Sequence, residues 1–233
     1  MRIHRGGVTP SYDRYGSIVT ALGDRFLLLR MPEVDAAKQA KGALAQAKHE
    51  KRMRVELAEA MTGLIASANP EDVHTELSDD ETERLVSLAS FAARARTCVE
   101  RDGYTGELLV IPQAEGPARL VKALRLTYGA LGALGVDSAT RWDLVCRMAR
   151  DCAPAMRVPL MAELLKQTDL LGSEPRRTAD IAEHVGMVTK TAGRVLDDLA
   201  MLHIAERTKK TDAANSPDLW SATRWLREHW PDA

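Results

Sequence analysis

Apolar residues recur at helical spacing through most of the chain, and they predict four helices before residue 154. These helices cover residues 35–66, 78–101, 115–134 and 138–151. Ser78 and Glu81 form a capping-box pair at the start of the second helix. Gly135 ends the third helix, while Gly42 inside the first is a candidate kink. Short apolar runs at residues 25–29 and 104–112 predict extended segments. The pattern therefore favours a mainly α protein.

A different pattern occupies residues 176–207. Two short apolar stripes follow one another there, formed by Ile181, Ala182 and Val185, and then by Ala192, Val195, Leu196 and Leu199. Gly186 separates the stripes, and Thr178 and Thr189 are the predicted N-caps of the two helices. This is the spacing of a winged helix-turn-helix, which places its second helix in the DNA major groove.

The residues after this pair of helices are consistent with a wing. A basic run at residues 206–210 precedes a loop rich in Asp, Asn, Ser and Pro. Residues 219–223 are predicted to return as the second wing strand, with the Trp220 ring packed on the helices. Two departures from the usual motif are Gly193 inside the second helix and His203 where a glycine is common. A helical hairpin with only a structural role, or a winged helix that contacts proteins, remains an alternative.

Basic and polar side chains around these helices are the candidate DNA contacts. They are Arg176, Arg177, Thr189, Lys190, Thr191, Arg194, Arg207, Lys209 and Lys210. Residues 155–233 nevertheless carry 11 Lys or Arg and 12 Asp or Glu, and the whole chain has a formal net charge of −1. We therefore expect modest, salt-sensitive affinity that dimerisation would raise. Double-stranded DNA and a second copy of the chain are the expected partners.

Composition narrows the class of protein further. Hydrophobic residues make up 45% of the chain but aromatic residues only 4%, so Leu, Ala, Val and Met must form a helical core. The sequence has no apolar run of the roughly 20 residues that span a membrane, and its N-terminus lacks a signal-peptide core. Three cysteines without CxxC spacing indicate reduced thiols, with no metal or other cofactor. We expect a cytoplasmic protein without membrane contact.

Residues 6–32 (GGVTPSYDRYGSIVTALGDRFLLLRMP) resemble the end of the nucleotide-binding core in bacterial MCM-like AAA+ ATPases. The helices that follow are similar to the lid of that family, and the winged helix comes after the lid in the same order. The resemblance implies that Arg25 would reach the γ-phosphate of ATP on a neighbouring subunit. It also implies that Arg119 would contact nucleotide in cis. An arginine suits both roles because its planar, permanent charge offsets phosphoryl charge.

The chain departs from the family where catalysis requires it most. It contains no GxxxxGK[ST] loop and no strand ending in paired acids ahead of Thr9. We therefore expect no enzyme activity unless a partner chain supplies those parts. Residues 26–29 would be a buried strand in the parent sheet. Here they should pack on the lid helices, pair with residues 108–111, or drive self-association.

These observations define the expected organisation and two hypotheses for function. Residues 1–34 would be a poorly ordered remnant of the ATPase core, residues 35–153 a helical lid-like bundle, and residues 154–233 a winged helix-turn-helix with a small β wing. The chain would bind DNA as a transcriptional regulator or as the DNA-engaging tail of a truncated replication-type ATPase. Alternatively, it is an assembly module that supplies Arg25 in trans to a Walker-bearing partner.

Overall fold

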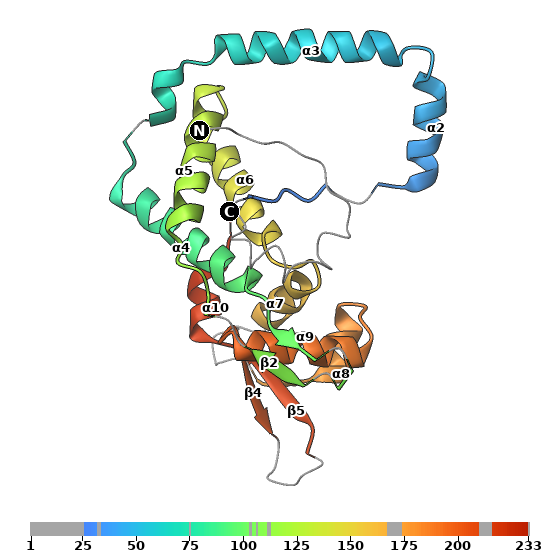
Figure 1. Ribbon diagram of the computed structural model, residues 1–233, viewed down its shortest axis with the longest axis vertical. Coiled ribbons are helices and arrows are strands. Elements are labelled where there is room, and N and C mark those ends of the chain that lie inside the picture. The colour runs from blue at the N-terminus through green and yellow to red at the C-terminus, as the bar shows by residue number, and fades with distance from the viewer. Residues whose placement is uncertain are drawn as a thin grey trace.

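The computed structural model is mainly helical, with two small antiparallel sheets (Figure 1). It describes residues 26–31, 34–74, 76–102, 104–105, 107–110, 113–166, 174–209 and 216–232. The predicted mainly α class is confirmed by the helices of these residues. Over the same residues, no helix has the length and apolar character that crossing a bilayer requires.

A helical arm leads into the body of the molecule. It consists of α2 (Ala36–Gln46), α3 (Glu50–Ser67) and the turn between them. The Asp35 carboxylate caps α2 by accepting hydrogen bonds from two backbone N–H groups. The prediction of one continuous helix is thus wrong: the break falls at residues 47–49, and Gly42 lies inside α2. No residue of either helix is buried, and the arm arches away from the body in Figure 1.

The body begins with a bundle of helices around one apolar cluster. Its elements are η2 (Pro70–His74), α4 (Asp79–Arg96), α5 (Ala118–Ala133) and α6 (Ser138–Asp151). The predicted capping box is confirmed, because Ser78 Oγ accepts from the N–H of Glu81 while the Glu81 carboxylate accepts from that of Ser78. Gly135 has the positive φ of 79° that ends α5. Leu85, Leu88, Leu124, Trp142 and Val145 form the centre of this cluster.

The helix α4 is shorter than predicted, because a small hairpin follows it. The hairpin pairs β1 (Glu100–Arg101) antiparallel with β2 (Leu108–Val110). Asp102 orders the turn by accepting hydrogen bonds from the N–H groups of Tyr104 and Thr105. Within the described part of residues 104–112, the predicted extended segment is present only as β2.

The C-terminal part of the chain alternates helices with the strands of a second sheet. Its elements are α7 (Arg157–Leu165), β3 (Arg176–Arg177), α8 (Thr178–His184), α9 (Thr189–Met201), β4 (Ala205–Lys209), β5 (Asp218–Ala222) and α10 (Arg224–His229). The strands lie in the order β3-β5-β4 and are all antiparallel. The predicted Trp220 contact is also present, because Trp220 on β5 is buried among α7, α8 and α9.

The apolar core of this part extends across the boundary expected after residue 153. Phe91, Ala95 and Val99 belong to the same cluster as the buried residues of α7, α8 and α9. The Phe91 ring stacks on Trp225 with centroids 6.4 Å apart and meets the edge of Trp230 at 5.6 Å. Phe91 on α4 is thus enclosed by two tryptophans of the C-terminal segment.

Residues 26–31 form no regular strand. Leu27 packs against the first apolar cluster, whereas Phe26 and Leu29 are about half exposed. Arg30 ties the segment to the end of α6, because its N–H donates to Asp151 Oδ2 at 2.6 Å and its guanidinium to the Ala153 carbonyl at 3.0 Å. Of the three expected placements for residues 26–29, packing on the helices is the one found. Residues 1–25, expected to be poorly ordered, lie outside the described residues.

Candidate nucleic-acid interface

The turn between α8 and α9 is closed by backbone hydrogen bonds. Gly186, at φ 67°, follows α8, and the N–H of Met187 bonds back to the carbonyl of Ala182 at 2.8 Å. This is the pattern of a Schellman motif, and it confirms the predicted break at Gly186. The second helix then starts three residues after Gly186, at Thr189.

The two predicted N-caps are wrong by one residue. Arg177 and Val188 hold the N-cap positions, and neither provides a side-chain cap. Thr178 is instead the first residue of α8, where its hydroxyl oxygen accepts from Trp220 Nε1 at 2.8 Å. This bond fixes the sheet to the start of α8, which no local pattern could reveal.

The helix α9 has one buried face and one exposed face. Ala192, Val195, Leu196 and Leu199 are buried against α7, α8 and the sheet. Lys190 and Arg194, four residues apart, are exposed on the opposite side. Thr189 is exposed beside Lys190, whereas Thr191 is half-buried on the flank of α9. The predicted recognition residues therefore do share one end of one helix.

Two acidic residues lie further along α9, and arginines from flanking strands pair with both. Arg207 on β4 contacts Asp197 Oδ1 at 2.8 Å, and Arg101 on β1 contacts Asp198 Oδ1 at 2.7 Å. Arg207 also binds Asp218 at 2.8 Å. The hydrogen bond with Asp218, followed by the charge of Asp197, raises the pKa of Arg207 despite its partial burial. Both carboxylates of α9 are thus paired with arginines, while Lys190 and Arg194 form no ion pair within the described residues.

The consecutive arginines of β3 have different environments. Arg176 donates to Glu163 Oε1 at 2.6 Å, and Glu163 is only 4% exposed. Burial pushes the pKa of Glu163 upward, but hydrogen bonds from Arg176 and Lys166 outweigh it and hold the pKa below its ordinary value. Arg177 is exposed beside the start of α8. We therefore keep Arg177 among the candidate DNA contacts and assign Arg176 to holding α7 and β3 together.

The wing strands contribute fewer free charges than the sequence suggested. Lys209 is exposed at the end of β4, and Lys210 lies outside the described residues. Arg207 is engaged by the two carboxylates described above. The candidate interface therefore consists of Arg177, Lys190, Arg194 and Lys209.

The hairpin β1–β2 lies beside α9, and sequence reasoning did not anticipate it there. The ion pair between Arg101 and Asp198 holds it in place. Its tip carries Tyr104, which is 99% exposed. Glu100, Asp102 and Glu107 give this hairpin a negative charge. Only the long-range pairing of Arg101 reveals the contact, and no local spacing encodes it.

Of the two residues assigned to nucleotide by resemblance, only Arg119 lies within the described residues. Arg25 lies outside the described residues. The Arg119 side chain is 61% exposed near the start of α5 and comes within 3.8 Å of Glu115. Arg119 lines neither the hollow beside Leu77 and Val121 nor the one beside Tyr128 and Gly132. No family model, curated protein or solved structure matches this chain.

Proposed function

We propose that the chain binds double-stranded DNA through a winged helix-turn-helix formed by α7 to β5. The observation that carries the proposal is the exposed end of α9, where Lys190 and Arg194 have no acidic partner among the described residues while Asp197 and Asp198 are both paired. A helix presented in this way fits the major groove, and its first turns reach base edges and phosphates.

The arrangement of elements supports the same proposal. A helix, a short strand, two helices and two further strands follow one another, with the first strand next to the last. In a winged helix this order brings the β4–β5 hairpin alongside the recognition helix. Here Lys209 at the end of β4 would contact the phosphate backbone while α9 occupies the groove.

The small number of free charges determines how such binding would respond to salt. Arg177, Lys190, Arg194 and Lys209 together would touch about four phosphates, so log K should fall with log salt with a slope of roughly −3.6. Raising salt from about 50 to 200 mM would then weaken binding by roughly a hundredfold. This sensitivity distinguishes phosphate contacts from apolar association.

The test is fluorescence anisotropy of labelled duplex DNA titrated with the full chain at two salt concentrations. Lys190→Glu/Arg194→Glu should abolish binding without unfolding the protein, because both side chains are exposed on α9. The matched control is Arg119→Glu/Lys122→Glu, which changes the net charge equally on the exposed side of α5. The control should bind as the parent does.

Equal loss of affinity in both double variants would show that only net charge matters and would contradict the assigned interface. No binding by the folded parent chain would favour the second candidate, an assembly module for a Walker-bearing ATPase subunit. That candidate predicts complex formation that depends on Arg25 and is indifferent to Lys190 and Arg194.

A further inference from the structure

The helical arm is the largest part of the described chain whose helices bury no residue. Its large apolar residues are exposed, among them Leu57 at 64%. Met53, Leu57, Met61 and Leu64 recur at spacings of four, four and three residues, which places them in one stripe along α3. A helix of 18 residues with such a stripe and no buried residue requires a partner surface for stability.

The first part of the arm is also positively charged. Residues 36–54 contain six Lys or Arg and one Glu. Within the described residues, its ion pairs join Arg52 to Glu56 and Arg54 to Glu50, whereas Lys38, Lys41, Lys48 and Lys51 form none. The partner surface should therefore be acidic as well as apolar.

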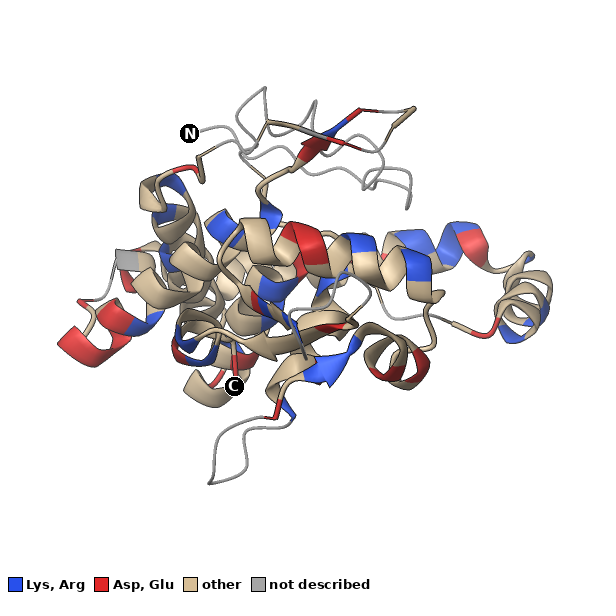
Figure 2. Ribbon diagram, turned by 90° about the horizontal axis from the view of Figure 1, so that it is seen from below, with Lys and Arg blue, Asp and Glu red and all other residues tan. Residues whose placement is uncertain are grey.

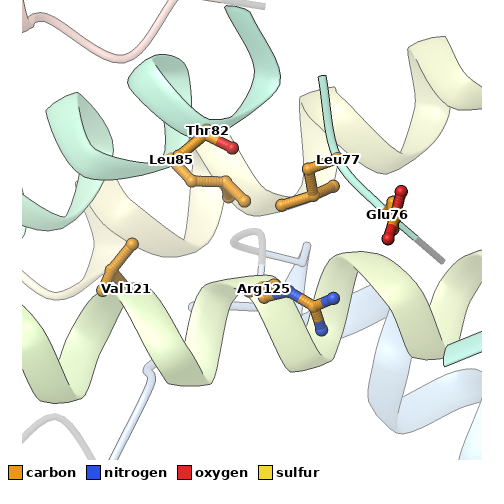
Figure 3. Close-up of a pocket in the computed structure, with 6 residues that line it drawn as sticks. All are labelled: Glu76, Leu77, Thr82, Leu85, Val121 and Arg125. Atoms are coloured by element: carbon orange, nitrogen blue, oxygen red, sulfur yellow. The ribbon is translucent and has the colours of Figure 1, made fainter. Parts of the chain in front are cut away.

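The body of the same chain presents a surface of that kind. Residues 71–83, from η2 to the first turns of α4, contain seven Asp or Glu and no Lys or Arg. This acidic surface borders a shallow hollow whose apolar walls are Leu77, Leu85 and Val121, with Glu76 and the guanidinium of Arg125 toward one end (Figure 3). In Figure 2 the acidic turns gather at the left edge, while basic residues recur on the arm at the right.

We propose that two copies of this chain associate by docking the arm of each on the acidic surface of the other. The apolar stripe of α3 would enter the hollow beside Leu77 and Leu85, and Lys48 and Lys51 would meet Glu76 and Asp80. Lys51 lies about 9 Å before Leu57 along α3 and about 120° around it, so its side chain would contact the acidic surface at the edge of the docked stripe. The pairing is reciprocal, as two-fold symmetric dimers require.

The size and composition of the arm favour a second copy over other partners. One face of helices of 11 and 18 residues falls short of the roughly 20–30 residues a side of a standard stable interface, but in a reciprocal dimer each copy also contributes its acidic surface. Nucleic acid would satisfy the lysines but would leave Leu57 and Leu64 in water. The arm also lies at the opposite end of the molecule from α9 (Figure 1), so one straight duplex would not engage both. The proposal does not depend on DNA binding.

The first experiment measures the mass of the full chain by sedimentation equilibrium across the micromolar range. The parent should be dimeric, and Leu57→Glu/Met61→Glu should be monomeric. The matched control is Thr62→Glu/Ala66→Glu, which places two charges, also four residues apart, on the opposite face of α3 and should leave the dimer intact. Neither change can disturb a packed core, because α3 buries no residue. A monomeric parent, or equal behaviour of the variants, overturns the proposal.

A charge exchange tests the acidic surface itself. Lys48→Glu/Lys51→Glu should raise the dimer dissociation constant roughly tenfold or more, and adding Glu76→Lys/Asp80→Lys should restore it. Failure of the combined variant to recover excludes this contact. An arm variant that loses DNA affinity while its mass is unchanged identifies nucleic acid as the occupant instead. Lys190→Glu/Arg194→Glu should still dimerise, which separates this proposal from the DNA-binding one.

Discussion

Replacing each of the two consecutive arginines of β3 by alanine should have opposite consequences. Arg176 is bonded to a buried carboxylate, whereas Arg177 is exposed at the candidate interface. Arg176→Ala should therefore destabilise the fold, and Arg177→Ala should weaken DNA binding while leaving stability unchanged. The pair is informative because a sequence reading assigns both residues to DNA.

The magnitude follows from the burial of the ion pair. Removing one partner of a buried pair costs about 3–5 kcal/mol, because a charge stays buried without compensation. Here the Arg176 side chain is 18% exposed, and Lys166 remains 3.1 Å from Glu163. We therefore expect a loss of about 2–3 kcal/mol in the free energy of unfolding for Arg176→Ala. In a chain of this size that lowers the Tm by about 4–12 °C.

The assay is thermal unfolding followed by circular dichroism, repeated as the pH is lowered. The pKa of Glu163 is lower in the folded chain than in the unfolded one. The stabilisation is therefore complete above the unfolded pKa of about 4.3 and disappears as the pH falls through the folded value. The difference in Tm between parent and Arg176→Ala should be full at pH 7 and shrink below about pH 4. Equal Tm values at pH 7, or a difference that does not change with pH, would refute the reasoning.

Three further substitutions probe α9 and its surroundings. Gly193→Ala should raise the free energy of unfolding by up to about 1 kcal/mol in chemical denaturation, because alanine favours the helix and its Cβ fits at an ordinary 3.4 Å from Thr178 Cγ2. Loss of DNA affinity in this variant would instead indicate that the backbone of α9 approaches DNA closely. His203→Gly should stabilise by about 1 kcal/mol in the same assay, since His203 has a φ of 56° after α9, and an unchanged midpoint would contradict strain there. Arg207→Ala should weaken DNA binding several-fold in low-salt anisotropy by exposing the charge of Asp197, an effect that should fade at high salt.

Local signals in the sequence predicted the elements whose ends are set locally. The helix over residues 138–151 was placed correctly, and Ser78 and Gly186 mark a helix start and a helix end by short-range hydrogen bonds. The sequence also favoured helix after Asp35, but neither proline nor glycine marks the break at residues 47–49.

Contacts between distant residues account for what the sequence could not show. The sequence predicts Thr178 as an N-cap, but in the structure its hydroxyl oxygen accepts a hydrogen bond from Trp220 Nε1 on β5. The sequence predicts Arg176 as a DNA contact, but in the structure it donates a hydrogen bond to Glu163 on α7. Arg101 had no predicted role, because only the hairpin brings it to α9. At the candidate interface, the sequence predicts which residue types share a helix face, but it does not predict which acidic group pairs with each basic one.

The enclosure of Phe91 by Trp225 and Trp230 has a consequence for synthesis of the chain on the ribosome. The α4 face that carries Phe91 emerges well before α10, and at roughly 5–20 residues per second several seconds separate the two. During that interval the first bundle can close, but the Phe91 side remains open to water and to holdase chaperones. Completion of the core is therefore a late event, governed by translation speed between α4 and α10.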